Sequence, residues 1–292
     1  MENKTIKKKR TKIITLSVIG ITLVLLIVWV AWGNNALELN SYSIASNSLP
    51  KEFDGFRIAH VSDLHNAEMG KDNEKLISML ADAEPDIIVI TGDMIDSRNT
   101  KVDVALAFAE QAVKIAPCYY VTGNHEARVD EYSDLKDGLI ELGVTVLEDA
   151  KTEMACSGES IVLVGVSDPS FQTDYLFGDD ETVLNSKLNE LISEEDGYVI
   201  LLYHRPELFD TYVENKVDLI FSGHAHGGQF RIPFIGGVVA PNQGLFPKFD
   251  AGIYTEGNTN MVVSRGVGNS IIPFRVNNRP EVILIELTTQ GE

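Results

Sequence analysis

The stretch VDLIFSGHAH (217–226) decides the fold, because a short apolar run ends abruptly in a glycine and two histidines. Four other places in the chain repeat this design. Apolar runs of this length, without polar alternation, are typical of strands buried on both faces. The other four runs are RIAHVS (57–62) before Asp63-Leu64-His65, DIIVIT (86–91) before Gly92-Asp93, CYYVT (118–122) before Gly123-Asn124-His125-Glu126, and YVILLY (198–203) before His204.

Amphipathic stretches with helical periodicity separate these runs, and Pro85 and Pro206 punctuate them. Strands that alternate with helices predict a layered α/β domain, here over residues 56–292 with no second domain boundary. In such sheets ligands gather at the carboxyl ends of the strands, where all five polar clusters fall. The acidic stretch 167–182 is expected to form a surface loop. The predicted helices cover 73–83, 102–115, 131–142, 181–194 and 206–214.

Residues 13–32 form an uncharged run, IITLSVIGITLVLLIVWVAW. Twenty residues of helix span about 30 Å, the thickness of a bilayer's hydrocarbon core, so we expect a transmembrane signal anchor. A cleaved signal peptide is the main alternative, but its apolar region is shorter and ends in a small-x-small site. A buried core helix is a second alternative, although this run has no polar face.

The flanks of this run predict its orientation. Residues 1–12 hold six basic residues and one acidic residue, which predicts a basic tail that stays in the cytoplasm. The domain would then lie outside the cytoplasm, on a single-pass protein of the cell membrane. Residues 33–55 include Pro50 and Gly55 and are expected to form a linker into the domain.

The charge of the chain excludes some partners. The 24 Lys and Arg residues against 43 Asp and Glu residues give a net charge of −19, and removing residues 1–12 leaves 18 against 42, or −24. Such an acidic body is repelled by nucleic acid and by anionic lipid head groups. An anionic substrate therefore needs a local positive feature. Cys118 and Cys156 form no Cys-x-x-Cys pair, and both a disulfide and two free thiols stay open.

The five polar clusters combine metal-binding residue types. Asp63 and His65 are two positions apart, as are His224 and His226, and in extended chain this spacing points both side chains to one side. Each piece alone has an ordinary explanation, such as a turn or a helix cap. Five pieces at five strand ends favour one shared site. Glycines precede several of the polar residues, where a strand must turn sharply: Gly92, Gly123 and Gly223.

In kind and order, the five motifs resemble the signature of the calcineurin-like metallophosphoesterases. The motifs are DLH (63–65), GD (92–93), GNHE (123–126), His204 and GHAH (223–226). Three longer matches resemble the membrane-anchored or exported bacterial branch of that family: HRPELF (204–209), GHAHGGQ (223–229) and SRGVGNSIIPFRVNNRPEV (264–282). The resemblance implies a four-layer α/β/β/α sandwich that holds two divalent metal ions.

Carried over motif by motif, the resemblance assigns every ligand. Glu126 and Ala225 stand where Asp and Thr are common in the family, and neither change removes a ligand. His125 would protonate the leaving oxygen or steady the transition state, with the orientation of a ligand as its alternative role. The implied ligands are Asp63, His65 and His226 for the first ion, Asn124, His204 and His224 for the second, and Asp93 as the bridge.

Two divalent ions, two carboxylates and a bridging hydroxide give a site of about +1, which supplies the positive feature that the body lacks. Paired metals lower the pKa of bound water and clamp a phosphoryl group. Imidazole, carboxylate and amide ligands favour Mn, Fe or Zn. We therefore predict a membrane-anchored binuclear phosphoesterase that attacks phosphodiesters or phosphomonoesters with a metal-bound hydroxide. The alternatives are a protein phosphatase and a non-catalytic metal-binding or sensor domain.

Three further features carry weaker expectations. His60 differs in parity from Asp63, so it is expected to be a core residue. Asp168 is either an acid that orients a ligand or an ordinary turn residue. The apolar segment 229–249 either lines a wall that accepts a lipid chain or forms strand pairs packed on the core. The first possibility makes a phosphate linked to a lipid or the cell envelope a candidate substrate. The sequence does not indicate which oligomeric state the protein adopts.

Overall fold

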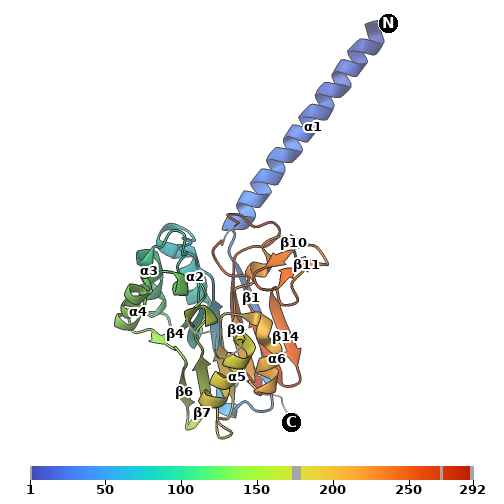
Figure 1. Cartoon of the computed structure of the whole chain (residues 1–292). Coiled ribbons are helices and arrows are strands. Elements are labelled where there is room, and N and C mark those ends of the chain that lie inside the picture. The colour runs from blue at the N-terminus through green and yellow to red at the C-terminus, as the bar shows by residue number, and fades with distance from the viewer. Residues whose placement is uncertain (1, 173–178, 270–271, 290–292) are drawn as a thin grey trace.

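The computed structural model describes residues 2–172, 179–269 and 272–289, with side chains from residue 7 onward. Its first sheet has six strands in the order β1-β16-β2-β3-β4-β5 (Figure 1). β2 to β5 run parallel to one another, β16 is antiparallel to β2, and β1 is parallel to β16. The strands are β1 (Glu38–Ser46), β16 (Glu281–Thr289), β2 (Arg57–Val61), β3 (Ile87–Thr91), β4 (Cys118–Val121) and β5 (Thr145–Val146).

The second sheet also has six strands, in the order β14-β15-β9-β8-β7-β6. Its centre is parallel from β15 to β7, and an antiparallel strand closes each edge. The strands are β14 (Gly252–Glu256), β15 (Thr259–Val263), β9 (Leu219–Ser222), β8 (Val199–Leu202), β7 (Glu159–Gly165) and β6 (Ala150–Cys156). The five apolar runs before the polar clusters thus form β2, β3, β4, β8 and β9, as predicted.

The helices form the two outer layers. Three helices cover the first sheet, and two helices cover the second sheet (Figure 1). All five predicted helical stretches contain helix, although the last one begins with a 3-10 turn over Pro206–Leu208. The helices are α2 (Glu74–Ala83), α3 (Val102–Ala112) and α4 (Tyr132–Glu141) on one side, and α5 (Asp180–Leu191) and α6 (Phe209–Glu214) on the other.

Three buried clusters confirm the four-layer α/β/β/α order. Ile88 and Ile90 of β3 face the first helix layer, while Val89 points into the cluster between the sheets with Phe221. A third cluster joins the second sheet to α5 and α6 around Leu188. Both faces of the central strands are therefore buried, which explains their unbroken apolar sequences.

The predicted linker over 33–55 is partly wrong. Nine of its residues form β1, which pairs with β16 from Glu38↔Glu281 to Ser46↔Thr289. Ile44 is buried between the two sheets. The polar residues of β1 lie at a sheet edge, so the strand lacks the apolar run that marks the central strands. Because its partner lies more than 200 positions away, nothing in the local sequence indicated the pairing.

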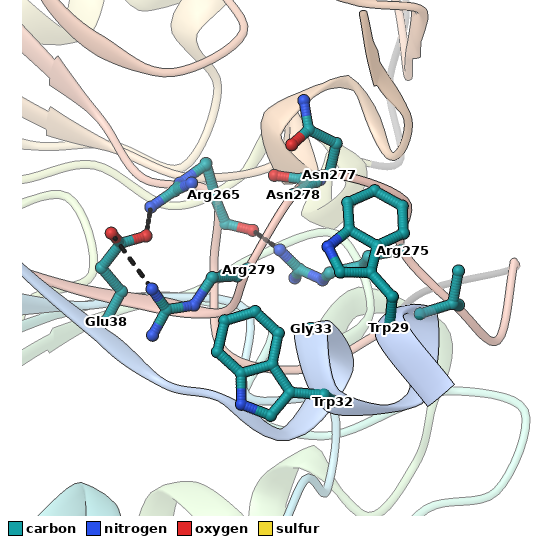
Figure 2. Close-up of a pocket in the computed structure, with 10 residues that line it drawn as sticks. Trp29, Trp32, Gly33, Glu38, Arg265, Arg275, Asn277, Asn278 and Arg279 are labelled. Carbon is teal, nitrogen blue, oxygen red and sulfur yellow. Dashed lines mark hydrogen bonds and ion pairs between the residues drawn. The ribbon is translucent and has the colours of Figure 1, made fainter. Parts of the chain in front are cut away.

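The N-terminal helix α1 (Glu2–Asn35) leaves the domain at one end (Figure 1). Residues 7–35 are long and apolar enough to cross a membrane, and none of this apolar stretch is buried in the domain. The last turn of α1 is tied to the chain near residue 275 (Figure 2). Asn34 Nδ2 donates to the Arg275 carbonyl at 2.9 Å, and the Arg275 N–H donates to Asn34 Oδ1 at 2.7 Å. The Arg279 guanidinium stacks over Trp32 at 5.2 Å and donates to the carbonyl of Ala36 just beyond the helix.

Both cysteines are free thiols. Cys118 is buried in β4, and Cys156 ends β6 in a half-buried position. The sequence left open a disulfide or two free thiols, and the structure has two free thiols. Within the predicted acidic loop, Pro169–Phe171 form a 3-10 turn and α5 begins at Asp180, while residues 173–178 lie outside the described part.

Candidate metal centre

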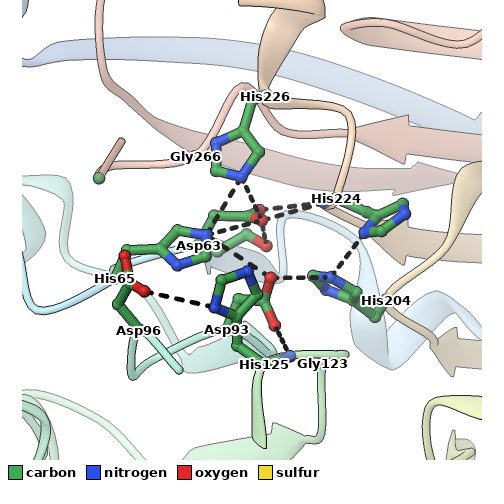
Figure 3. A network of polar contacts seen from close by, with 12 residues as sticks. Asp63, His65, Asp93, Asp96, Gly123, His125, His204, His224, His226 and Gly266 are labelled. Carbon is green, nitrogen blue, oxygen red and sulfur yellow. Dashed lines mark hydrogen bonds and ion pairs between the residues drawn. The ribbon is translucent and has the colours of Figure 1, made fainter. Parts of the chain in front are cut away.

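The loops after five strands bring the predicted ligands together at the carboxyl ends of the strands, and Figure 3 labels all of them except Asn124. The first sheet contributes Asp63, His65, Asp93 and Asn124, and the second contributes three histidines, namely His204, His224 and His226. All seven side chains are buried.

The first group of possible metal ligands consists of Asp63, His65, Asp93 and His226. One donor atom from each lies within 4.8 Å of the others. His226 Nε2 lies 3.3 Å from Asp63 Oδ1, and His65 Nε2 lies 3.5 Å from Asp93 Oδ2. The two histidine Nε2 atoms are 3.1 Å apart. These atoms converge from three separate loops on one small volume.

The second group shares Asp93 with the first. Asp93, His204 and His224 have donor atoms within 4.8 Å of one another. His204 Nε2 lies 3.3 Å from Asp93 Oδ2 and 3.1 Å from His224 Nδ1. Asn124 is buried in the neighbouring loop, and its Oδ1 has no hydrogen-bond partner among the described residues. An amide oxygen without a hydrogen-bond partner is available as a ligand for a cation.

The histidine tautomers fit a cation site. His204 Nδ1 lies 2.7 Å from the Thr91 carbonyl and therefore carries a proton, so Nε2, which faces Asp93, is the nitrogen that can bind a cation once it loses its own proton. Metal-binding histidines commonly donate their other ring N–H to such a carbonyl. Nδ1 of His65 and Nε2 of His224 are buried without a partner among the described residues. The donors are imidazole, carboxylate and amide, and no thiol belongs to either group.

The ligand loops use an unexpected backbone conformation. Asp63, His65, His224 and His226 have φ values of 51°, 44°, 64° and 47°, in the left-handed region, and they follow the last strand residue. These left-handed loop conformations, rather than an extended chain, direct the four side chains toward one another. The expectation that an extended chain aligns residues two positions apart is wrong. Non-glycine residues at positive φ carry an energetic cost and cluster at functional sites.

The predicted glycines serve two different purposes. Gly92 has φ 82°, so it meets the expectation of a sharp left-handed turn. Gly123 and Gly223 do not have positive φ, and space is the reason for them instead. A Cβ at Gly123 would lie 2.3 Å from Asp93 Oδ1, and one at Gly223 would lie 2.2 Å from Asp63 Oδ2.

Burial and charge set the protonation of the site. Burial lowers the pKa of His224 and His226 to about 3, which keeps both rings neutral with lone pairs available at neutral pH. Burial raises the pKa of Asp63 and Asp93, but the facing histidines outweigh it and hold both carboxyls below their usual range. Burial also lowers the pKa of His204, yet Asp93 and other carboxylates raise it to about 10. A bound cation would take the place of that proton.

His125 lies beside the first group, with its ring edge-on to His65 at 4.5 Å between centroids. The Ser97 backbone N–H donates to His125 Nδ1 at 3.0 Å, so the neutral ring carries its proton on Nε2. Burial lowers the pKa of His125, and Asp93 offsets only part of this effect. His125 is thus a neutral hydrogen-bond donor at the edge of the site.

Sequence reasoning assigned no role to Glu126. Its buried carboxylate accepts the N–H groups of Asp93 at 2.9 Å, Met94 at 2.8 Å and Gly123 at 2.8 Å. One side chain therefore ties together the two loops that carry Asp93 and Asn124. Its position inside the GNHE motif was the available signal.

Asp168 is more than an ordinary turn acid, although it does cap the 3-10 turn by accepting the Ser170 N–H. Its buried carboxylate pairs with Arg205 through two hydrogen bonds of 2.8 and 2.9 Å. Arg205 follows His204 directly, so the pair fixes the strand end that carries this ligand. His60 lies in the core as predicted, hydrogen-bonded to Thr91 at 2.8 Å and edge-on to Phe221.

Two residues of the C-terminal segment also contact the centre. Asn278 Nδ2 donates to the His226 carbonyl at 2.7 Å, and Arg275 Nη2 lies 3.5 Å from His226 Nδ1. Arg275 is the residue tied to the end of α1, so the centre lies close to that end of the domain.

The segment 229–249 forms two short strand pairs, β10 (Arg231–Ile232) with β11 (Gly236–Gly237) and β12 (Val239–Ala240) with β13 (Gly244–Leu245). The expected strand pairs exist and Ala240 of β12 packs in the third core cluster, but most of their large apolar side chains are not buried against the core. Phe234 is fully exposed, and Leu245 and Phe246 are 71% and 60% exposed.

Comparison with known proteins agrees with this geometry. Residues 56–228 match the family model described as calcineurin-like phosphoesterase. The metallophosphoesterase YkuE of Bacillus subtilis (strain 168) is 29% identical over 86% of this chain and 85% of its own length. The phosphodiesterase YaeI of Escherichia coli (strain K12) is 27% identical over 80% of this chain and 82% of its own length.

Two further similarities are to a protein named as a transmembrane protein and to a solved structure. The transmembrane protein with metallophosphoesterase domain of Danio rerio is 27% identical over 84% of this chain and 56% of its own length. The crystal structure of TT1561 of Thermus thermophilus superposes with a TM-score of 0.50 over 73% of this chain and 90% of that protein. At 15% identity, the latter likeness concerns the fold alone.

Proposed function

Because the chain belongs to the calcineurin-like phosphoesterase family, we propose that it is a membrane-anchored hydrolase that cleaves phosphodiester or phosphomonoester bonds with two divalent cations. The observation that carries this proposal is the position of Asp93. Its Oδ2 lies 3.5 Å from His65 Nε2 in one group and 3.3 Å from His204 Nε2 in the other. One oxygen that reaches both groups supports a bridged pair of ions over a single isolated ion.

The ligands divide as the motifs imply, with Asp93 shared between the two sets. Mn, Fe and Zn suit these donors. Bound there, the cations supply positive charge for phosphoryl oxygens and lower the pKa of water. The chain itself positions the ligands, since Glu126 holds the Asp93 loop and the Thr91 carbonyl orients His204. The first ion would be held by Asp63, His65 and His226, and the second by Asn124, His204 and His224.

For His125, we propose the role of a hydrogen-bond donor to the phosphoryl or leaving oxygen. Of the two roles that the resemblance implies, this one fits the contacts better than proton donation. Protonating Nδ1 would place its N–H against the Ser97 N–H, which already points at that nitrogen from 3.0 Å. A neutral ring with its proton on Nε2 avoids this conflict and still stabilises developing negative charge.

We propose that α1 anchors the chain with residues 1–12 in the cytoplasm and the domain outside. The basic tail and the length of the apolar stretch support this orientation. The metal-ligand groups adjoin the base of the helix through His226, Arg275 and Asn34. This proximity favours a substrate phosphate that is linked to a lipid or to the cell envelope.

Hydrolysis of bis-p-nitrophenyl phosphate by the purified full chain, with and without added Mn²⁺, tests the proposal. We expect Mn²⁺-dependent turnover that falls at least about 1,000-fold in Asp93→Asn and about 100-fold in His125→Ala. Asp82→Asn, an exposed change on α2, is the matched control and should keep the full rate. Full activity in Asp93→Asn would defeat the proposal.

The alternatives give different results in the same assay. Tight Mn²⁺ binding without turnover of any phosphoester indicates a sensor domain, and turnover confined to phosphoproteins indicates a protein phosphatase. A higher kcat/KM for a phosphodiester lipid in vesicles than for a soluble diester supports the lipid-linked substrate.

A further inference from the structure

The exposed apolar side chains of the domain are concentrated in one place. Among the described residues outside α1, only Tyr42 and Ile140 are large, apolar and exposed elsewhere on the domain. We call the concentrated set the hairpin patch, since five of its members lie on or directly beside the strands of the two pairs after the metal motif. It consists of Ile232, Phe234, Ile235, Leu245, Phe246 and Phe274.

Hydrogen bonds hold the hairpin patch in place, so its exposure is built into the fold. Val238 N–H donates to the Phe230 carbonyl at 2.8 Å, and Phe246 N–H donates to the Val238 carbonyl at 2.9 Å, which joins the two strand pairs. Asp250 braces the first pair by accepting from the Gly237 N–H at 2.5 Å and from Arg231 Nη1 at 3.0 Å. Apolar groups presented on a braced support mark a contact surface.

The hairpin patch adjoins the base of α1. Figure 1 shows β10 and β11 at the end of the domain from which the helix leaves. The Arg231 N–H donates to the Val276 carbonyl at 3.0 Å, and the rings of Phe230 and Phe274 are 5.5 Å apart. The backbone of Arg275, between these contacts, exchanges two hydrogen bonds with the side-chain amide of Asn34 in the last turn of α1.

We propose that the hairpin patch inserts into the surface of the bilayer that α1 spans, as a second membrane contact of the catalytic domain. This inference rests on the proposed membrane anchor. The bilayer is the occupant that the structure favours, because the patch continues from the end of an apolar helix long enough to span it. Trp29 and Trp32, near that end, are the side-chain type that settles at the head-group level.

Docking of this kind would fix the orientation of the metal centre. His226 precedes the first hairpin by only a few residues and contacts Arg275, which is bonded to the base of α1, so one candidate ligand lies next to both membrane contacts. The domain would then present its centre at the bilayer surface, where a phosphate in the head-group layer lies within reach. Because the chain without residues 1–12 carries a net charge of −24, apolar insertion rather than attraction to anionic lipid provides the contact.

Lipid quenching of a fluorophore at single cysteines tests the proposal on the full chain in phosphatidylcholine nanodiscs. A Cys156→Ser background removes the accessible thiol, and Cys118 is buried. Bimane is attached in Phe234→Cys and Phe246→Cys, both exposed positions where a label leaves the core intact. The lipid carries a doxyl quencher on its acyl chain.

Two control positions interpret the result. Ile140→Cys, on the exposed face of α4, is the matched control far from the patch, and Val24→Cys reports the anchor itself. We expect quenching at positions 234 and 246 to exceed that at 140 at least threefold. If the label at position 24 is quenched but the labels at positions 234, 246 and 140 are quenched weakly and equally, the docking proposal is overturned and the anchor proposal stands. Absence of quenching at 24 and at 234 would overturn both.

Discussion

Replacing Gly223 by alanine is expected to dismantle the first group of ligands without touching a ligand side chain. An added Cβ would lie 1.9 Å from Ser62 Oγ and 2.2 Å from Asp63 Oδ2. Ordinary contact begins at 3.4 Å, so the Asp63 carboxylate would have to retreat by more than 1 Å. Metal–ligand bonds tolerate deviations of only about 0.2 Å. We therefore expect a loss of Mn²⁺ affinity of about 10- to 100-fold and a loss of about 1–3 kcal/mol in the free energy of unfolding.

Gly197→Ala provides the matched control for this change. It adds the same methyl group just before β8, where no atom lies within 4 Å and φ is not positive, so binding and stability should stay close to those of the parent. Isothermal titration of Mn²⁺ into the metal-stripped full chain measures affinity, and chemical denaturation in chelator measures stability. If Gly223→Ala binds Mn²⁺ as tightly as Gly197→Ala, then Asp63 does not hold an ion and the assignment of the first group fails.

Three shorter predictions concern groups around the centre. Glu126→Gln should lower the free energy of unfolding by about 2 kcal/mol and weaken Mn²⁺ binding, because an amide NH₂ would face N–H groups that now share a carboxylate. Chemical denaturation measures the first effect and Mn²⁺ titration the second. An unchanged Mn²⁺ affinity would contradict the prediction. Burial raises the pKa of Asp168, but hydrogen bonds from Arg205 outweigh burial and hold this pKa below its usual value. The ionised Asp168 therefore stabilises the fold above about pH 4, and this stabilisation is lost as the pH falls. Asp168→Asn should therefore lower the free energy of unfolding by about 3 kcal/mol at pH 7, with a shrinking difference below pH 4 in denaturation curves. Burial raises the pKa of Cys118 to about 12, so iodoacetamide at pH 8 should modify Cys156 first, as peptide mass spectrometry can show.

The sequence predicted the central elements because their signals are local. β3 and β9 are unbroken apolar runs, and a strand buried on both faces needs little more than such a run. β1 escaped prediction because its edge position lets polar residues such as Ser41 and Ser43 remain, and its pairing with β16 depends on residues far along the chain. Elements whose stability comes from a distant partner carry little local signature.

The identities of the candidate ligands were predictable, whereas the way they converge was not. Motif order predicted which side chains meet, but left-handed φ values at positions such as Asp63 and His226 set their directions. The pairing of Asp168 with Arg205 joins residues that are 37 positions apart, so no spacing rule could have separated this acid from an ordinary turn residue.

The hairpin patch shows why apolar composition alone does not predict burial. Phe234 and Phe246 have the same hydrophobicity as the core residue Phe221, yet they are exposed because they lie at the ends of short strand pairs, whereas Phe221 lies in the central strand β9 between the two sheets. Removing such side chains from water still stabilises, by about 25 cal/mol per Å² of apolar surface. The fold leaves this stabilisation unused, and the exposed apolar surface begins where an apolar helix enters the domain. The proposed contact with a bilayer would explain both observations.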